Sequence, residues 1–376
     1  MSKIRIKNIL EQYNYSNITI GVLGSHSALD VCRGAKDEGF ATLVVAQKGR
    51  ERVYHDYFRT DGSRGCVDSC IILPSFSHIL ENDILQELRK RNVIFVPHRS
   101  FEVYLGSNYG AIENDFLVPI FGNKYLLKIE ERGTKPNQYD LLREADIRFP
   151  RQFKKAKDID RLCLVKILEK SRGFERAFFL ANSYQDYEKQ IEEKEAKSII
   201  GEKQINQSII EEFILGVQVN FNFFYSPISK KLELLGTDMR RQTNIEGLLR
   251  LPAKYQHIVG DQINITYEEA GHVAVTVLES LLEDAYAIGE RFVQASQKLF
   301  SPGIIGPFAL QSIITSGPPK KEIVVIDVSL RMPGSPGISA TPYSTYLFGK
   351  PVSVGRRVAV EIKEAIKNKS LSKIIT

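Results

Sequence analysis

The order of hydrophobic and polar positions in the first part of the chain predicts a repeated strand and helix unit. Apolar runs at 18–23 and 41–46 have the length and composition of buried strands. Between them, small and apolar residues recur at helical spacing: Ala28, Val31, Cys32 and Ala35. The pattern returns with a strand over 67–73, a helix over 79–91 and a strand over 93–97. Strands that alternate with helices form parallel sheets, so we expect a Rossmann-like parallel-sheet domain here.

The remaining chain shows a different pattern, which predicts mainly antiparallel strands. Short apolar runs at 162–166 and 177–181 indicate strands, and the alternating run at 217–225 indicates a strand with one buried face. The further expected elements are a helix over 184–197, strands over 209–215 and 232–236, a polar loop up to Arg250, a long helix over 275–300, and strands over 307–315 and 322–330. The fold class is therefore α/β in the first part and α+β in the rest.

Length and composition are those of a globular chain with more than one domain. The 376 residues are 43% hydrophobic and 26% charged, and 51 Lys and Arg against 45 Asp and Glu give a formal charge of +6. At roughly 100–200 residues per domain, this length predicts two or three domains. We expect an N-terminal Rossmann-like domain over 1–122, a small subdomain with its linker over 123–215, and a large C-terminal domain over 216–376.

Charge and hydropathy argue against several classes of partner. No apolar run approaches the ~20 residues that cross a bilayer, and the first residues lack the uninterrupted apolar core of a secretory signal. We therefore expect no membrane association and a cytoplasmic location. Residues 356–376 hold six Lys and Arg and two Glu, which is +4 of the +6, and predict a helix with a solvated basic face. A nucleic-acid stripe is the weaker alternative there, because no motif interleaves aromatic and basic residues, and we expect no nucleic-acid partner.

The four cysteines do not predict a disulfide framework in a chain of this size. Cys66 and Cys70, with His78 beyond them, have the residue types of a metal site. A C-x3-C spacing without a second pair is a weak signal, however, so we expect buried thiols.

Two loops of the predicted parallel sheet carry the first candidate site residues. Functional groups in such sheets follow the carboxyl ends of the strands, where the loops 24–27 and 97–100 begin. Each loop holds a histidine and a serine: His26 with Ser27, and His98 with Ser100. The free N–H groups of a helix N-terminus suit a phosphate, so we expect a small, polar, phosphorylated ligand. The alternative for Ser25 or Ser27 is a helix N-cap.

A second group of candidates is spread over the later strands. Lys166 ends a buried strand, where its ammonium group suits phosphate oxygens. The run Glu211, Glu212, Phe213 and Ile214 offers backbone groups and a carboxylate to an adenine nucleotide. Gln311 and Asp327 lie on neighbouring strands, and their oxygens suit Mg²⁺ together with nucleotide phosphates. The alternatives are a hydrogen-bonded strand residue for Gln311, and a salt bridge from Asp327 to Arg331 on the same strand face.

With these residues in this order, the chain resembles the ATP-grasp superfamily and, within it, the archaeal 5-formaminoimidazole-4-carboxamide ribonucleotide (FAICAR) synthetases. The order is a Lys at a strand end, then E-E-F-I-x-G, then acidic-x-polar-x-Arg. The similar segments run nearly end to end, at 23–27, 96–101, 116–123, 210–214, 224–227, 234–238, 244–254, 306–312 and 351–366. The resemblance implies an ATP-grasp architecture preceded by a Rossmann-like (preATP-grasp) domain.

The resemblance also implies an activity and a set of site residues. The implied enzyme is a ligase of purine biosynthesis that joins formate to the 5-amino group of 5-aminoimidazole-4-carboxamide ribonucleotide (AICAR), splitting ATP through formyl phosphate. It implies ATP and Mg²⁺ (or Mn²⁺) as cofactors, and we expect a homo-oligomer. The implied residues are His26, Ser27, His98, Ser100 and His272 at the ribonucleotide; Lys166, Glu211, Glu212, Phe213, Ile214 and Gln242 at ATP; Gln311 and Asp327 at the metal; and Lys166 and Arg331 in catalysis.

Several positions depart from the family pattern. The phosphate loop at 169–176 has one glycine, which limits how closely its backbone approaches phosphates, and residues 332–337 contain two prolines. Asp327 stands where Glu is usual, and Gln242 and His272 replace the commoner Glu and Asn. The alternative function is therefore a non-catalytic or substrate-shifted nucleotide-binding paralogue, and the alternative for His272 is an exposed loop histidine. We favour the ligase, because both histidine loops and Gln311 persist.

Overall fold

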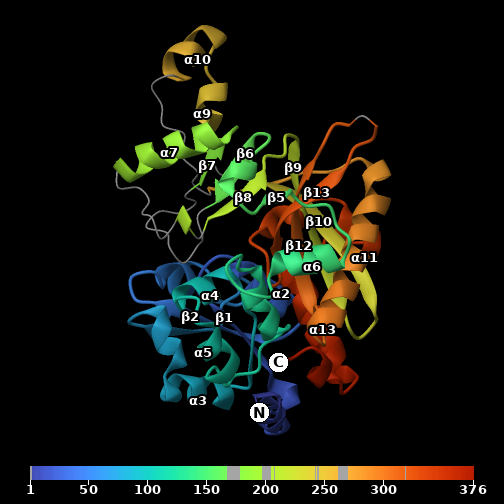
Figure 1. The fold of residues 1–376 in the computed structure, drawn as a ribbon. Helices are drawn as coiled ribbons and strands as arrows, with labels where there is room; N and C mark the ends of the chain where they lie inside the picture. The colour runs from blue at the N-terminus through green and yellow to red at the C-terminus, as the bar shows by residue number, and fades with distance from the viewer. Residues whose placement is uncertain are drawn as a thin grey trace.

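A computed structural model describes residues 2–166, 178–196, 205–206, 208–241, 243, 245–260, 270–317 and 319–376. Within this part of the chain, the strands form three sheets (Figure 1). We call them the parallel sheet (β3-β2-β1-β4), the small sheet (β5-β8-β6-β7) and the large sheet (β11-β10-β9-β12-β13). Each sheet lies within one of the three residue ranges expected as domains, while the domain boundaries themselves stay a prediction.

The parallel sheet confirms the repeated strand and helix unit. Its strands are β1 (Thr19–Leu23), β2 (Ala41–Gln47), β3 (Ser69–Leu73) and β4 (Val93–Phe95), and all neighbours are parallel. The helices of this part are α1 (Ser2–Glu11), α2 (Ala28–Asp37), α3 (Asn82–Lys90), α4 (Arg99–Tyr104) and α5 (Tyr109–Asn114). The apolar face expected for α2 is buried. Because β1 and β4 are adjacent and parallel, the loops that follow them leave the same edge of the sheet.

The large sheet is antiparallel and has one apolar and one polar face. Its strands are β9 (Val217–Ser226), β10 (Lys231–Arg241), β11 (Gly271–Ala274), β12 (Gly306–Ile314) and β13 (Ile323–Ser329). Successive side chains of a strand point to opposite faces. The apolar face packs against α11 (Leu282–Leu299) and includes Phe221, Phe223, Phe308, Leu310 and Val328. The opposite face carries Asn220, Asn222, Asp238, Gln311 and Asp327.

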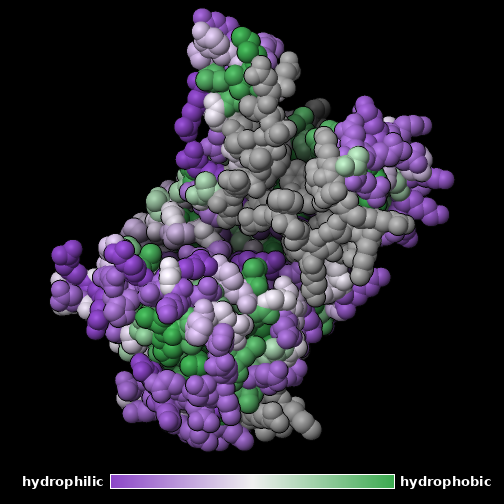
Figure 2. Space-filling view, turned by 90° about the vertical axis from the view of Figure 1, so that its left-hand side faces the viewer, coloured by the Kyte–Doolittle hydropathy of each residue, from purple (hydrophilic) through white to green (hydrophobic). Residues whose placement is uncertain are grey.

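The small sheet lies beyond the polar face of the large sheet (Figure 1). Its strands are β5 (Gln152–Phe153), β6 (Cys163–Lys166), β7 (Phe178–Ala181) and β8 (Ile209–Glu212), and α7 (Tyr184–Ala196) packs on it. The short helices α9 (Ile245–Leu249) and α10 (Ala253–Gly260) form a projecting tip, on which hydrophobic and hydrophilic side chains lie together (Figures 1 and 2). Helix α6 (Gln138–Glu144) packs on α11.

The end of the described chain returns to the parallel sheet. Helix α13 (Val354–Lys367) packs on α2, and α12 (Tyr343–Phe348) precedes it. Short turns of helix occupy 15–17, 53–57, 76–80, 124–130, 156–158, 279–281, 336–340 and 371–373. The backbone of Thr376 exchanges both hydrogen bonds with Ile120. The first and last parts of the chain therefore form one packed body.

Two expectations about elements were wrong. The helix over 275–300 begins only at Leu282, because the preceding residues alternate as β-branched Val273, Val275 and Val277, and β11 pairs with β10. The polar loop before Arg250 instead contains the end of β10 and helix α9. The terminal helix has the expected solvated basic face, with Lys363 and Lys367 exposed, although Arg357 is buried between Glu233 and Glu361. Among the described residues, no helix is both long enough and apolar enough to span a membrane.

Candidate active site

The two histidine loops of the parallel sheet lie against each other, as predicted. The rings of His26 and His98 are stacked, with centroids 5.4 Å apart and an interplanar angle of 21°. Ser100 donates a hydrogen bond from its hydroxyl to that of Ser25, at 3.0 Å. The carboxyl ends of β1 and β4 thus bring together four polar side chains that are far apart in the sequence.

His98 is a fully buried, neutral histidine. Its Nε2 lies 2.9 Å from the carbonyl oxygen of Leu23, so Nε2 carries the proton and donates it. Burial lowers the pKa of His98 to about 4. Nδ1 is then the acceptor of the ring, and it has no hydrogen-bond partner among the described residues. The ring therefore presents a fixed acceptor at this edge of the sheet.

His26 and Ser27 connect the parallel sheet to the loop that follows β13. Ser27 occupies the N-cap position of α2, as the N-cap alternative expected, but its side chain makes no capping hydrogen bond. Its hydroxyl donates instead to the carbonyl of Pro333, at 2.5 Å, and lies 2.8 Å from Nδ1 of His26. A Cβ on Gly334 would lie 2.6 Å from Nε2 of His26, so a larger residue at 334 would displace the His26 ring from this position.

His272 lies in the same region but on a strand rather than in an exposed loop. It belongs to β11, and its side chain is 10% exposed. Its Nδ1 lies 2.6 Å from Oδ2 of Asp238 and 3.1 Å from the hydroxyl of Ser335. Ser335 follows Gly334, so His272 and His26 approach the two ends of one short loop. The exposed-loop alternative is therefore wrong.

Asp238 was not identified from the sequence, although a signal was available. The alternation of Asn220 and Asn222 with phenylalanines in β9 shows that polar side chains line one face of a buried strand. Both amides donate to Asp238, at 2.9 Å from Asn220 and 2.6 Å from Asn222. These bonds and the one with His272 hold the pKa of Asp238 below its usual range, although burial acts in the opposite direction.

The predicted metal residues are direct neighbours on the polar face of the large sheet. Gln311 stands opposite Asp327 on β13 and opposite Asn220 on β9. The side chain of Gln311 donates to Ser329 at 3.4 Å. One carboxylate and one amide oxygen are hard ligands of the kind that Mg²⁺ and Mn²⁺ take, so the pair fits a divalent cation shared with a phosphate group.

The alternative for Asp327, a salt bridge with Arg331, is wrong. Asp327 pairs with Arg132 instead, with Nη2 2.8 Å from Oδ1. Burial alone would raise the pKa of Asp327, but the cations Arg132, Lys166 and Arg240 hold it below its usual range. The carboxylate is therefore ionised and lies in a field of positive charge that also suits phosphate oxygens.

Lys166 is paired with a residue of the predicted nucleotide run. Its Nζ lies 2.5 Å from Oε2 of Glu211, which also accepts a hydrogen bond from the hydroxyl of Tyr139. Burial, together with the nearby charge of Arg132, lowers the pKa of Lys166. Lys166 and Asp327 are thus close enough for their charges to act on each other, across the space between the small and large sheets.

The rest of the predicted nucleotide run makes other contacts. Glu212 accepts from Arg148 at 2.9 Å and is 3.5 Å from Arg161. The backbone N–H of Phe213 donates to Leu162, and Ile214 follows at the end of β8. Gln242 and the phosphate loop 169–176 lie outside the described residues, so their predicted roles stay predictions.

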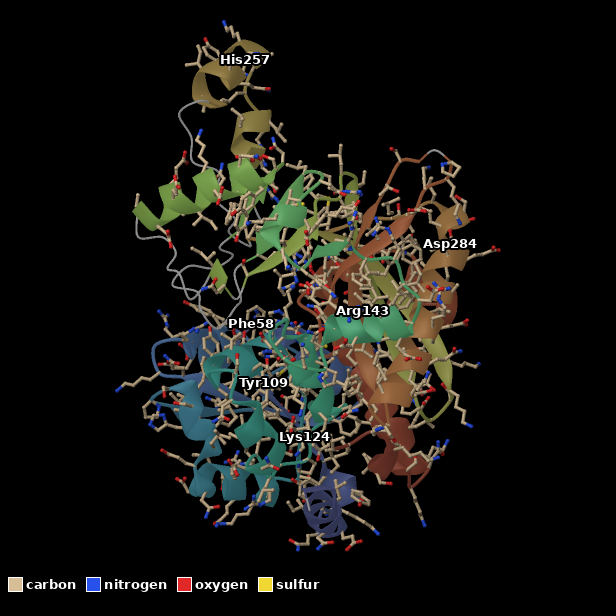
Figure 3. The ribbon with its side chains drawn as sticks, in the orientation of Figure 1. Phe58, Tyr109, Lys124, Arg143, His257 and Asp284 are labelled. Carbon is tan, nitrogen blue, oxygen red and sulfur yellow. The ribbon has the colours of Figure 1, made fainter. Side chains whose placement is uncertain are left out.

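Arg331 belongs to a buried ionic cluster. Its guanidinium lies 3.4 Å from Glu102 of α4 and 3.2 Å from Glu130. Arg99 lies 3.3 Å from Glu102 and 3.1 Å from Glu131. The hydroxyl of Tyr109, labelled in Figure 3, donates to Glu131. Arg331 thus connects the parallel sheet to the large sheet, a role that the sequence did not indicate, and its catalytic role stays a prediction.

The cysteines and the terminal basic residues do not enter this site. Cys66 is buried and Cys70 partly buried, both as free thiols. No group of three or more metal-binding His, Cys, Asp or Glu side chains occurs in the described part of the chain. His257 lies on α10, at the projecting tip (Figure 3).

Two family models cover most of the chain, and both describe families of unknown function. The model described as "Protein of unknown function (DUF1246)" matches residues 20–153. The model described as "Domain of unknown function (DUF1297)" matches residues 186–376. Together they span the parallel sheet and the large sheet.

Unlike the two family models, curated relatives and solved structures carry names that state a function. The 5-formaminoimidazole-4-carboxamide-1-(beta)-D-ribofuranosyl 5'-monophosphate synthetase of Methanocaldococcus jannaschii is 37% identical over 378 residues, covering 100% of each chain. The synthetase of the same name from Methanothermobacter thermautotrophicus is 38% identical over 385 residues, again covering 100% of both. The crystal structure of an IMP biosynthesis protein PurP from Thermococcus kodakaraensis has a TM-score of 0.69 and 29% identity, covering 95% of this chain and 100% of that one.

A more distant structure shows how widely the fold is shared. Phosphoribosylglycinamide synthetase from Anaerococcus prevotii has a TM-score of 0.55 at 14% identity, covering 92% of this chain and 75% of that chain. This likeness concerns the fold alone, which is an ATP-grasp architecture preceded by a Rossmann-like parallel sheet. At 37% identity over the full length of both sequences, the chain belongs to the family of the 5-formaminoimidazole-4-carboxamide-1-(beta)-D-ribofuranosyl 5'-monophosphate synthetases.

Proposed function

We propose that this chain is an ATP- and formate-dependent ligase that formylates AICAR to FAICAR in purine biosynthesis. The observation that carries the proposal is that the candidate ribonucleotide site and the candidate metal site adjoin each other. The histidine loops of the parallel sheet reach His272 through the loop at 333–335, and the same polar face of the large sheet carries Gln311 and Asp327. A ribonucleotide at the histidines and ATP at the metal residues would thus lie on adjoining surfaces.

The proposed ribonucleotide site consists of His26, Ser27, His98, Ser100 and His272. His98 supports this assignment, because a buried acceptor without a partner is costly until a ligand donates to it. The stacked rings of His26 and His98 add a polar surface beside the N-terminus of α2, whose free N–H groups favour a phosphate.

The proposed nucleotide site uses the cations between the small and large sheets. Lys166 would leave Glu211 to bind phosphate oxygens of ATP, and the segment Glu211–Ile214 with Gln242 would hold the base and sugar. Gln311 and Asp327 would bind Mg²⁺ or Mn²⁺, which neutralises charge on the phosphate groups when bound. The ion pair of Asp327 with Arg132 shows that this carboxylate already lies in a cationic field.

The chemistry follows from the weakness of formate as an electrophile. A carboxylate oxygen of formate attacks the γ-phosphorus of ATP, which releases ADP and gives formyl phosphate. The 5-amino nitrogen of AICAR then attacks the formyl carbon, phosphate leaves with the electron pair of its C–O bond, and the nitrogen loses one proton. Lys166 and Arg132 would stabilise the negative charge on the transferring phosphoryl group. Enclosure between the sheets would keep water from the acyl phosphate.

One assay tests this function against the non-catalytic alternative. ADP release is measured with ATP, Mg²⁺, formate and AICAR, and then with formate or AICAR omitted in turn. We expect ADP release to require both, with FAICAR formed in equal amount. ADP release without FAICAR would indicate a shifted substrate. Binding of ATP and AICAR without turnover would indicate the non-catalytic paralogue.

We also propose that the protein is a homo-oligomer and is located in the cytoplasm. Analytical sedimentation tests the oligomeric state, and cell fractionation tests the location.

A further inference from the structure

Asp238 is the centre of a hydrogen-bonded group on the polar face of the large sheet. Three side chains donate to its two carboxylate oxygens: the amides of Asn220 and Asn222 from β9, and the Nδ1 of His272 from β11. Asp238 itself is 1% exposed. A buried carboxylate with three donors is ionised, and its charge decides how each donor is turned.

The orientation of the two asparagines follows from that charge. The N–H₂ of each amide must face the carboxylate, because the opposite orientation would place two oxygens against each other. The carbonyl oxygens therefore point away from Asp238. Asn220 and Asn222 are 3% and 0% exposed, and neither Oδ1 has a hydrogen-bond partner among the described residues.

His272 follows the same logic. Its Nδ1 lies 2.6 Å from the ionised carboxylate of Asp238, so this nitrogen carries a proton and donates it. Ser335, at 3.1 Å from the same Nδ1, belongs to the loop that reaches His26. Asp238 thus turns the carbonyl oxygens of Asn220 and Asn222 away from itself, in a region that adjoins the proposed ribonucleotide site through His272.

We propose that Asp238 is a positioning residue whose hydrogen bonds with Asn220 and Asn222 create a floor of two carbonyl acceptors that binds an N–H donor group of the substrate. This inference rests on the proposed function and specifies it: the floor recognises the neutral carboxamide and amino groups of AICAR and rejects an anionic carboxylate at the same ring position. Unpartnered buried carbonyl oxygens are costly, and a ligand that donates to them removes this cost.

A neutral donor fits this floor better than a cation does. Hard cations prefer at least one carboxylate oxygen, and both oxygens of Asp238 are already occupied by N–H donors. The neighbouring carboxylate, Asp327, lies two strands further across the sheet from Asn220 and pairs with Arg132. The asparagine oxygens are therefore left for hydrogen bonding.

The test compares two nucleotides that differ at one group. Calorimetry gives the dissociation constants of AICAR and of 5-aminoimidazole-4-carboxylate ribonucleotide for the native chain and for Asp238→Asn. A neutral residue at 238 no longer fixes the amides of Asn220 and Asn222. Their N–H groups can then turn towards the ligand and donate hydrogen bonds to its carboxylate. We expect the native chain to prefer AICAR by about 100-fold and the variant to prefer it by roughly 10-fold or less.

Two further measurements keep the result interpretable. Glu144→Gln, an exposed residue of α6 paired with Lys298, serves as the matched control and should keep the native preference. If Asp238→Asn fails to fold, Asn222→Ala removes one acceptor and should also reduce the preference. Nitrogen-15 shifts of His272 in the native chain should show a protonated Nδ1.

The outcomes separate this inference from the proposed function. An unchanged preference in a folded Asp238→Asn variant would overturn the acceptor floor and leave the ligase intact. A variant whose Mn²⁺ requirement changes, while its nucleotide preference does not, would also overturn it, in favour of a cation at the asparagines. A native chain that binds neither nucleotide would overturn the proposed function, and this inference with it.

Discussion

The stacked pair of His26 and His98 shows how burial decides the chemistry of a single residue. Both are histidines in matching loops, but His98 is wholly buried and donates to a backbone carbonyl. His26 has a left-handed backbone, with a φ of 52°, and contacts Ser27. His98 is therefore locked in one neutral form, which makes its effect on stability measurable.

The pKa of His98 predicts a loss of stability in mild acid. An unfolded histidine has a pKa of ~6.5, whereas burial lowers the pKa of His98 to about 4. Between these values the unfolded chain binds a proton that the native chain does not, so this residue's destabilising effect is absent above ~6.5 and grows as the pH falls towards 4. We expect a loss of about 2–3 kcal/mol between pH 7 and 4.5.

Urea unfolding of the native chain and of His98→Gln at both pH values measures this loss. Glutamine keeps a donor for the carbonyl of Leu23 but does not titrate, so its stability should fall less between pH 7 and 4.5. Equal losses in the two proteins would show that His98 does not cause the acid sensitivity.

Lys166 carries the second prediction at this scale. Removing it alone would leave Glu211 buried beside Tyr139, which costs stability and obscures the function. The double variant Lys166→Met with Glu211→Gln avoids this. If Lys166 binds ATP, loss of its charged hydrogen bonds should raise the KM for ATP by about 10–100-fold and leave the binding of AICAR nearly native.

Lys189→Met is the matched control, because Lys189 is exposed on α7. Its KM for ATP should equal that of the native chain. A native KM in the double variant would remove Lys166 from the nucleotide site.

Residue types were easier to predict than their partners. Histidines after parallel strands and a lysine at a strand end are visible in the sequence, because position relative to a strand is a local property. The partner of Asp327 is not local: the sequence offered Arg331 on the same strand face as the alternative to a metal, whereas Arg132 approaches from a segment that the fold brings near. The predicted roles of Gln242 and the phosphate loop stay predictions.

At the scale of elements, the packing of α13 on α2 depends on two glycines. A Cβ on Gly34 would lie 2.1 Å from the backbone nitrogen of Arg356, and one on Gly355 would lie 2.3 Å from the carbonyl oxygen of Asp30. The helices therefore approach backbone to backbone. This close contact holds the terminal helix against the parallel sheet.

Gly34→Ala should destabilise the chain although alanine is the better helix former. Backbone atoms cannot move aside as the end of a side chain can, so we expect a loss of about 1–3 kcal/mol in the free energy of unfolding. Gly247 in α9 is the matched control, because a Cβ there meets nothing within 4 Å, and Gly247→Ala should be neutral or slightly stabilising. Equal effects of the two substitutions would contradict the close packing.

The sequence predicted most elements and failed where tertiary pairing overrode local pattern. The repeated unit of the parallel sheet follows from the periodicity of 18–97 and was confirmed. The residues before α11 have enough apolar character to extend a helix, but the backbone N–H groups of Val275 and Val277 donate to Thr237 and Tyr343 instead of forming helical hydrogen bonds. Likewise, the basic residues of α13 indicated a solvated face, while the position of Glu233 on β10 turned Arg357 inwards.

At the scale of the whole molecule, the ionic cluster around Arg331 joins the parallel sheet to the large sheet. Glu102 comes from α4, Glu130 and Glu131 end the short helix over 124–130, and Arg331 follows β13. The N–H of Leu330 also donates to Glu130. Three buried carboxylates face two guanidinium groups, so one negative charge is left over and favours a retained proton.

Glu102 is the residue expected to keep that proton. Burial, and then the charge of Glu130, raise its pKa to about 8. An unfolded glutamate has a pKa of ~4.3. The native chain therefore holds a proton that the unfolded chain has released, and the stability from this residue, full below ~4.3, is lost as the pH rises towards 8.

Glu102→Gln tests this assignment, because glutamine resembles the protonated acid and cannot ionise. Between pH 6 and 8 the free energy of unfolding of the native chain should fall by about 2–3 kcal/mol more than that of the variant, at ~1.4 kcal/mol per pH unit for one proton. Urea unfolding at the two pH values measures the difference, and Glu144→Gln, exposed beside Lys298, should follow the native chain. Parallel pH profiles for the native chain and Glu102→Gln would mean that the proton lies elsewhere in the cluster. A flatter profile for Glu102→Gln alone would show that Glu102 keeps the retained proton of this cluster between the two sheets.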